Sequence, residues 1–282
     1  MDLRVSRIYV YPIKSCGGVK VDEWPLEMYG FRYDRIWAVF SEDGLCVTQL
    51  EEPKMCLIQP EINLSKGKMT LTYAGNVDET PMTVDLETSK SGNSKKGKIS
   101  WGGSLEGIDC GEEVAAWLSF NLDVPGLRLI RCTARNPPKA NEFGMLDPKV
   151  MAASQCQYLL TTESTVKWLM NELEDDNGAM DFDNVLYRFR SNILIAGHLP
   201  ANSEVNWTEV TIGGTKFPVD TVCVRCRMVN IDQSSAEKNQ KPLRVLDHNK
   251  QKGKSVFGIY LKCEKPTGSV VRVGQSVDVT YE

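Results

Sequence analysis

Two cysteines three positions apart, Cys223 and Cys226, are the residues of this chain best suited to chemistry. Such a pair can be two buried core residues, a redox-active dithiol, or the source of one thiolate ligand for a soft metal. A thioredoxin-like dithiol needs a helix after the pair, whereas residues 228–231 look extended. Arg225 and Arg227 would lower the pKa of a neighbouring thiol and attract an anion, which fits a reactive or ligating sulfur. The spacing alone leaves these alternatives open.

Other catalytic arrangements have little support in the sequence. The only histidines are His198 and His248, both in polar, loop-like segments, so a Ser-His or Cys-His couple is not indicated. There is no HExxH motif and no second CxxC pair, which disfavours a zinc site. The GxGxxG and GxxxxGK(S/T) motifs of nucleotide-binding folds are also absent.

Length, composition and charge are those of an ordinary globular protein. The 282 residues are 41% hydrophobic and 25% charged, with a formal net charge of −4, which disfavours a general basic surface for nucleic acid. No run approaches the roughly 18 apolar residues of a membrane span, and the N-terminus lacks the apolar core of a secretory signal. Nine dispersed cysteines do not suggest a disulfide framework, so most are expected to be reduced and buried. We expect a cytoplasmic protein.

The elements that position these residues are predicted to be mostly strands. Alternating and β-branched runs predict strands that include residues 5–10, 36–40, 69–73, 226–231, 256–261 and 276–281. Gly213 and Gly214 predict the turn of a hairpin over residues 210–217. Amphipathic spacing and capping residues predict two helices, over residues 112–120 behind Asp109 and over residues 163–173 behind Thr162. Residues 88–98 are predicted to form a solvated loop.

These elements predict a fold class and a division of the chain. Strands that gather towards both ends, with few helices between them, predict a β-rich, mostly antiparallel α+β fold and not a doubly wound parallel sheet. Asn136-Pro137-Pro138 begins a loop that reaches about residue 150 and separates two parts. We therefore predict one domain over residues 1–135 and a second over residues 136–282.

Several segments, in the same order along residues 5–280, resemble the signatures of MOSC domain proteins. They are Tyr11-Pro12-Ile13-Lys14-Ser15-Cys16, Tyr33-Asp34-Arg35-Ile36-Trp37, Glu52-Pro53 with Cys56-Leu57-Ile58-Gln59-Pro60, Asp109-Cys110-Gly111-Glu112, Phe189-Arg190-Ser191-Asn192, residues 223–232, Pro242-Leu243 and Phe257-Gly258. MOSC proteins include the C-terminal domains of eukaryotic molybdenum cofactor sulfurases, which this chain resembles most, and the mitochondrial amidoxime-reducing component. The resemblance implies a β-barrel-like MOSC N-terminal subdomain packed on a β-barrel-like MOSC domain. It also implies the molybdenum cofactor, in which molybdopterin carries the metal.

The resemblance implies roles for particular residues. Molybdopterin carries a phosphate and an electron-rich pterin, which require fixed cations and amide or hydroxyl donors. The matching positions implied to bind the cofactor are Lys14, Ser15, Arg35, Thr48, Arg190, Asn192, Arg225 and Asp232. Cys226 matches the molybdenum ligand of the amidoxime reductases and is the implied metal ligand and catalytic residue, with Cys223 a structural neighbour. Gln155 and Cys156 stand where the reductases have small hydroxyl residues, so those two contacts are in doubt.

The resemblance leaves two activities open. In the first, the chain is of the molybdenum cofactor sulfurase type and holds the cofactor for sulfuration and transfer to enzymes of the xanthine dehydrogenase and aldehyde oxidase type. Its sulfur would come from a pyridoxal-phosphate cysteine desulfurase domain, for which 282 residues leave no room. In the second, the chain is an oxidoreductase that reduces N-hydroxylated substrates at a Cys226-ligated molybdenum, with electrons from a cytochrome b5 and its reductase. Residues 227–233 look closer to the sulfurases, whereas residues 268–274 look closer to the reductases. We favour the first activity.

Overall fold

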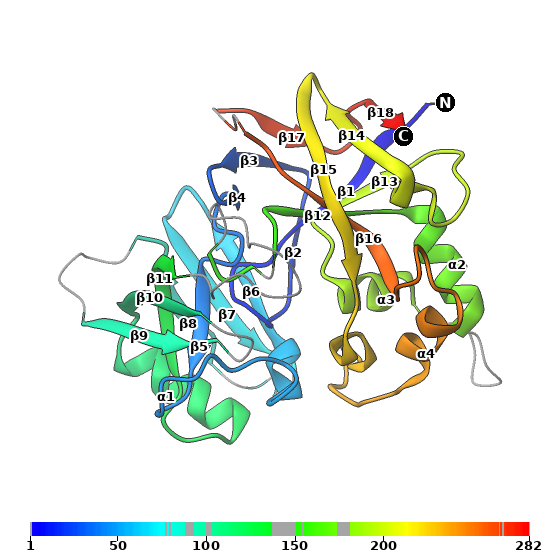
Figure 1. The fold of residues 1–282 in the computed structure, drawn as a ribbon. Helices are drawn as coiled ribbons and strands as arrows, with labels where there is room; N and C mark the ends of the chain where they lie inside the picture. Colours follow the sequence, from blue (N-terminus) through cyan, green and yellow to red (C-terminus); the bar gives the residue numbers. More distant parts are fainter. Residues whose placement is uncertain are drawn as a thin grey trace.

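The computed structural model describes residues 2–76, 78, 80–87, 93–99, 103–136, 151–153, 155–173, 181–264, 266 and 268–281. They form two lobes that lie side by side in Figure 1. Both ends of the described chain lie at the top of that view.

An eight-stranded sheet forms the centre of the C-terminal lobe. Its strands, in spatial order, are β18 (Val277–Tyr281), β14 (Trp207–Ile212), β15 (Thr215–Val224), β16 (Val256–Leu261), β12 (Tyr158–Thr162), β13 (Ile193–Ala196), β1 (Arg4–Val10) and β2 (Val19–Val21). The first strand of the chain therefore pairs with β13, deep in the C-terminal half of the sequence. β14 and β15 form the hairpin predicted at Gly213 and Gly214, both of which have positive φ.

Three smaller sheets complete the fold. One packs against the eight-stranded sheet and contains β17 (Val270–Arg272), β3 (Glu23–Glu27) and β4 (Gly30–Phe31). The other two belong to the N-terminal lobe: β5 (Trp37–Phe40), β11 (Arg128–Asn136), β10 (Ser104–Asp109) and β9 (Ser94–Lys98), and then β6 (Ile58–Asn63), β7 (Lys68–Tyr73) and β8 (Met82–Asp85). The Cys46 amide donates to the Lys98 carbonyl and the Lys98 amide donates to the Gly44 carbonyl, which closes the four-stranded sheet towards β5 and gives it a barrel-like shape.

The strand pairing confirms the predicted fold class. Between the named strands of the described chain, β12 and β13 pair in parallel and the other pairings are antiparallel. The protein is thus a β-rich, mostly antiparallel α+β fold with few helices. The division at residues 135 and 136 stays a prediction.

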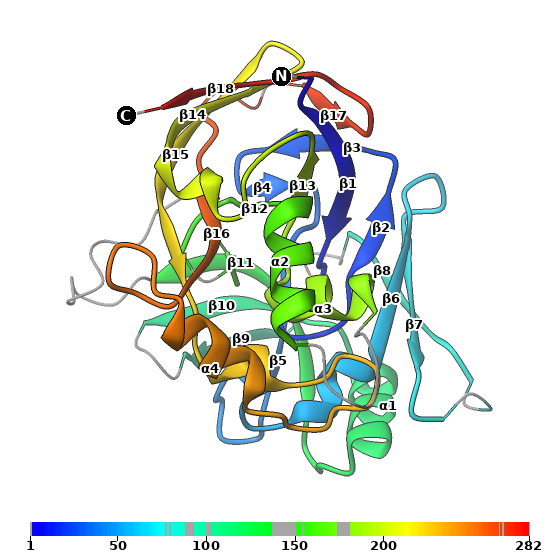
Figure 2. The same ribbon diagram turned by 90° about the vertical axis from the view of Figure 1, so that its right-hand side faces the viewer.

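Helices lie mainly on one side of the C-terminal lobe. The described residues contain α1 (Glu112–Leu122), α2 (Glu163–Leu173), α3 (Phe182–Phe189) and α4 (Lys241–His248), with the short 3-10 helices η1 (Pro53–Leu57), η2 (Ser203–Asn206) and η3 (Arg227–Asn230). Figure 2 shows α2 and α3 in front of the sheet. None of the helices in the described ranges is long and apolar enough to cross a lipid bilayer.

Of the two predicted N-terminal helix caps, one is confirmed and one is wrong. The Thr162 hydroxyl accepts a hydrogen bond from the Thr165 amide at 3.3 Å, which confirms the cap of α2. The prediction that Asp109 caps α1 is wrong, because Gly111 occupies the cap position. The Asp109 carboxylate instead accepts from the Gly111 amide at 3.0 Å and pairs with Arg128. It therefore holds the turn before the helix and not the helix itself.

The two faces of β1 belong to different cores. Ile8 and Val10 pack in the core inside the eight-stranded sheet, whereas Tyr9 and Tyr11 pack with the apolar faces of α2 and α3. This alternation follows the two-residue period of a strand. Because Tyr11 lies on the helix side, its ring is available to the residues that follow α3.

Two sequence predictions need correction. Residues 226–231, predicted as a strand, instead contain η3 with one residue on either side, because β15 ends at Val224 and the Val229 amide then bonds to the Cys226 carbonyl at 3.3 Å. The apolar side chains of Met228 and Ile231 that suggested a strand pack into the N-terminal lobe instead. Residues 94–98, predicted as loop, form β9 despite three lysines, because the strand pairs along β10 and exposes those side chains. Residues 88–92 of that predicted loop lie outside the described chain.

All nine cysteines are in the thiol form, and seven of them are buried. Cys110 is half-buried and Cys226 is exposed. This confirms the expectation of reduced, mostly buried thiols.

Gly258, in the middle of β16, provides a test of the fold. Its φ is +79°, and an added Cβ would lie 2.5 Å from the Leu160 carbonyl oxygen of β12. Gly274 also has positive φ, at +87°, but a Cβ there meets nothing within 4 Å. We expect Gly258→Ala to lower the free energy of unfolding by more than about 2 kcal/mol and Gly274→Ala by about 1 kcal/mol, measured in urea. Equal losses would show that close strand approach at Gly258 is unimportant.

Candidate functional site

Three segments distant in sequence meet where the two lobes join. They are the turn over residues 13–17, residues 33–36, and residues 189–192 after α3. The guanidinium groups of Arg35 and Arg190 both lie over the Tyr11 ring, at 4.7 and 4.4 Å from its centroid. Arg35 also donates from Nη2 to the Arg190 carbonyl oxygen at 2.8 Å. Two predicted cofactor-binding residues are therefore neighbours, and Tyr11, which was not predicted as a site residue, holds both.

The Arg35 guanidinium is oriented by an acid and an amide. Nη1 pairs with the Asp34 carboxylate and donates to Asn192 Oδ1 at 2.8 Å. Asn192 is buried, and its Nδ2 donates hydrogen bonds to Asp34 Oδ1 and to the Tyr9 carbonyl, both at 3.1 Å. Asn192 thus holds the ion pair of Arg35 and Asp34 in place, and its contact with a cofactor stays a prediction.

Arg190 is held almost entirely by neutral oxygen atoms. It donates from Nη1 to the Cys16 carbonyl and from Nη2 to the Ile13 carbonyl at 3.5 Å. Burial, and then repulsion from Arg35, lower the pKa of Arg190 to about 10, which leaves it charged at neutral pH. A half-buried cation without a carboxylate hydrogen-bonded to it leaves positive charge available to a ligand.

The backbone of these segments is unusual. Ser15, Tyr33, Arg35 and Arg190 have φ of 68°, 64°, 48° and 57°, which makes four of the eight non-glycine residues with positive φ in the described chain. Each such residue costs roughly 1 kcal/mol or more. At Arg190 the cause is visible, since it ends α3 and its amide bonds back to the Leu186 and Tyr187 carbonyls. Strain of this kind gathers at functional sites.

Lys14 adds a third cation beside these two. Its side chain is buried, and Nζ donates to the Ala152 carbonyl at 2.9 Å. Burial lowers the pKa of Lys14 to about 8; the neighbouring Cys46 thiol opposes this, and the charges of Arg135, Arg190 and Arg35 add to it. The structure therefore brings Lys14, Arg35 and Arg190 together, and an anion bound there would favour all three charged forms.

The two cysteines of the CxxC segment lie in different environments. Cys223 is in β15 and is 1% exposed, whereas Cys226 follows the strand and is exposed at the start of η3. Burial raises the pKa of the Cys223 thiol, while the charges of Arg225 and Arg35 act to lower it and the Cys226 thiol acts to raise it. The buried Cys223 thiol therefore lies within the electrostatic range of Arg225 and Arg35.

Arg225 links this segment to the residues before Arg190. Its Nε and Nη2 atoms donate to the Phe257 carbonyl at 2.9 and 2.6 Å, and Nη1 donates to the Phe189 carbonyl at 3.1 Å. The guanidinium also lies over the Phe189 ring, 5.1 Å from its centroid. These contacts hold the residue before Cys226 against the residue before Arg190.

Thr48 and Asp232 lie at the other edge of the junction and make local contacts. The Thr48 hydroxyl donates to the Glu51 carboxylate at 2.6 Å. Asp232 accepts from the Ser234 amide at 2.9 Å and pairs with Arg188. Burial acts to raise the pKa of Asp232, but hydrogen bonds from Ser234 and the charge of Arg188 outweigh it and lower the pKa to about 2. Contacts of either residue with a cofactor stay a prediction.

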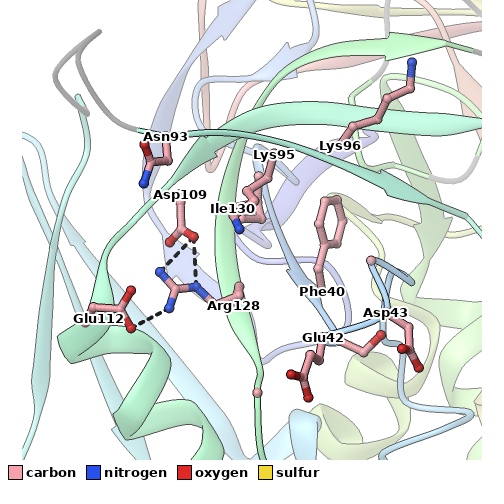
Figure 3. Close-up of a pocket in the computed structure, with 13 residues that line it drawn as sticks. Phe40, Glu42, Asp43, Asn93, Lys95, Lys96, Asp109, Glu112, Arg128 and Ile130 are labelled. Atoms are coloured by element: carbon pink, nitrogen blue, oxygen red, sulfur yellow. Dashed lines mark hydrogen bonds and ion pairs between the residues drawn. The ribbon is translucent and has the colours of Figure 1, made fainter.

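A separate cavity of about 470 Å³ lies in the N-terminal lobe (Figure 3). It opens at the ends of β5, β9, β10 and β11. Arg128 points into it and is held by Asp109 at 2.8 Å and by Glu112 at 2.6 Å. None of its described lining residues is a predicted site residue, and two carboxylates neutralise its arginine. This cavity is a poor match for an anion.

Comparison with known proteins identifies the family. The model of the MOSC N-terminal beta barrel domain matches residues 2–125, and the model of the MOSC domain matches residues 147–278. The chain is 38% identical over 263 residues to the molybdenum cofactor sulfurase of Bombyx mori, 36% over 288 residues to that of Danio rerio and 34% over 269 residues to that of Homo sapiens.

These alignments cover 91%, 97% and 91% of this chain but 31%, 34% and 30% of the relatives, so the chain spans about a third of their length. The matched residues of both domain models include the segments that meet at the lobe junction. The chain belongs to the MOSC family, with a MOSC N-terminal beta barrel domain followed by a MOSC domain.

Proposed function

We propose that this chain binds the molybdenum cofactor at the junction of the lobes. Lys14, Arg35 and Arg190 would hold the phosphate and pterin, and the molybdenum would lie beside Cys226. The observation that carries the proposal is the pair of guanidinium groups over Tyr11, because two like charges are brought together where few carboxylates balance them. A bound anion would lower the cost of holding these two charges together.

The electrostatics of the segment around Cys226 also fit an anionic cofactor. Residues 225–254 contain eight basic and three acidic residues, in a chain whose formal net charge is −4. Arg227 follows Cys226 directly, and the Arg225 amide bonds to the Ser255 carbonyl at 2.8 Å, which brings Lys254 near the same end. Arg227 and Lys254 are both exposed. Positive potential at this end would attract the cofactor towards the thiol.

The thiol of Cys226 suits the metal end of the cofactor. A thiolate is a soft ligand that molybdenum accepts, and Cys226 is exposed while Cys223 is not. When bound, the cofactor supplies a redox-active metal with exchangeable ligands. The chain itself would bind the phosphate and pterin, and the contacts of Arg225 with the Phe189 and Phe257 carbonyls would hold the thiol in place.

The names of the relatives favour sulfuration as the reaction. In that function the chain holds the cofactor as a substrate while a pyridoxal-phosphate cysteine desulfurase domain supplies sulfur. Recipient molybdoenzymes of the xanthine dehydrogenase and aldehyde oxidase type would then take up the sulfurated cofactor. The high proportion of this chain that aligns with molybdenum cofactor sulfurases supports this candidate.

The exposure of Cys226 favours a second candidate, reduction of N-hydroxylated compounds at the metal with electrons from a cytochrome b5 and its reductase. An exposed metal ligand leaves room for a substrate and for an electron donor. Turnover of benzamidoxime with an artificial electron donor would support this candidate, whereas bound cofactor without turnover would support the first.

Cofactor content tests the binding proposal directly. We expect protein purified from a cofactor-competent host to contain molybdenum and a pterin that fluoresces after oxidation. Arg190→Gln should lower the affinity for the cofactor about tenfold to hundredfold, since a hydrogen bond to a charged group contributes roughly 1.5–3 kcal/mol. Arg4→Gln, at an exposed position on β1, is the control and should retain the molybdenum and the pterin in wild-type amounts. Wild-type protein that carries neither metal nor pterin would refute the proposal.

The two cysteines are expected to respond differently to the same substitution. Cys226→Ser replaces the exposed thiol and should lower molybdenum retention while the melting temperature stays close to that of the wild type. Cys223→Ser places a hydroxyl at a site that is 1% exposed, and it should cost about 1–3 kcal/mol of stability with the metal retained in the folded fraction. Equal metal loss from both folded variants would instead indicate a paired dithiol site.

Lys14 makes a pH-dependent contribution to anion binding. Its pKa of about 8 means that the free site loses a positive charge as the pH rises through that value. We expect the affinity for sulfate, which does not titrate in this range, to fall from pH 7 to pH 9. Lys14→Met should bind sulfate more weakly at pH 7 and show a flatter profile. Parallel profiles for both proteins would mean that Lys14 does not bind the anion.

A further inference from the structure

Two glutamine side chains pair across the junction of the lobes. Gln49 Nε2 donates to Gln233 Oε1, and Gln233 Nε2 donates to Gln49 Oε1, both at 3.1 Å. Each Nε2 also donates to a backbone carbonyl, Gln49 to Ser15 at 2.8 Å and Gln233 to Ile231 at 3.0 Å. Gln49 is fully buried and Gln233 is half-buried. All four N–H donors of the two amides are therefore in use.

The hydrogen bonds permit one orientation of the pair. Turning the Gln49 amide over would place its oxygen against the Ser15 carbonyl, and turning Gln233 would do the same at Ile231. A buried polar group left without a partner costs about 1–3 kcal/mol. The pair is therefore a rigid connection, unlike contacts between flexible charged side chains.

The two backbone groups that the pair joins belong to opposite ends of the proposed site. Ser15 follows Lys14 in the turn whose Cys16 carbonyl accepts from Arg190. Cys226 and Ile231 are the residues that flank η3, Cys226 before it and Ile231 after it. The pair thus connects the turn that carries a cation to the short helix that follows the exposed thiol.

We infer that Gln49 and Gln233 are positioning residues that set the separation between the cations and Cys226. This inference rests on the proposed cofactor binding. Molybdopterin has a fixed length, so its phosphate end and its metal are both held only if the two ends of the site keep one separation. Without the pair, the cation cluster would still hold the phosphate and pterin, but the thiol would no longer be placed at the metal.

The test measures molybdenum per pterin in folded protein. Gln49→Met and Gln233→Met keep the side-chain length but remove the donors. We expect both variants to retain pterin while the molybdenum per pterin falls about tenfold, the usual lower limit when a group that orients a metal ligand is lost. Because Gln233 is only half-buried, its variant decides the question if Gln49→Met does not fold.

Gln157→Met provides the matched control. Gln157 is 1% exposed and also bridges backbone groups, donating to the Met28 carbonyl at 2.6 Å and accepting from the Cys263 amide at 2.7 Å. It should lower the melting temperature without changing the molybdenum per pterin. The same ratio in the wild type and in the Gln49 or Gln233 variant would overturn the inference and leave the proposed function intact. Wild-type protein without pterin would overturn the proposed function, and the inference with it.

Discussion

The contact of two guanidinium groups with one tyrosine ring is the interaction on which the site depends. Arg35 and Arg190 repel each other, and burial of either charge is costly. The face of the Tyr11 ring, the Asp34 carboxylate and several backbone carbonyls offset this cost. Each of these partners must be held in place, because cation–ring contacts and carbonyl hydrogen bonds lose most of their strength with small displacements.

That requirement accounts for the strand order of the large sheet. Tyr11 directly follows β1, and Arg190 lies three residues before the start of β13. The antiparallel pairing of β1 with β13 brings them together, with Ile8 opposite Ile193. The first strand of the chain must therefore join a sheet made from the C-terminal half. Ile13 then pairs with Trp37 of β5, which connects the same turn to the N-terminal lobe.

Local signals in the sequence predicted much of the fold and part of the site. Short-range patterns predicted the strands, the hairpin at Gly213 and the Thr162 cap. They did not predict η3, because Met228 and Ile231 are buried by the other lobe and so resemble the inward residues of a strand. Lys14, Arg35 and Arg190 were found through resemblance to a family. The pairing of Gln49 with Gln233 has no local signal, since two amides separated by most of the chain meet only after folding.

The cost of this arrangement is itself an argument for a ligand. The folded pKa of Lys14, about 8, lies below the ordinary value of 10.5, so the unfolded chain binds this proton more tightly. The contribution of Lys14 therefore destabilises the fold at neutral pH, and this penalty fades as the pH rises from about 8 to 10.5. Four strained residues add to the cost. A bound anion would raise the pKa of Lys14 and remove the penalty, which ties the stability of the junction to its occupancy.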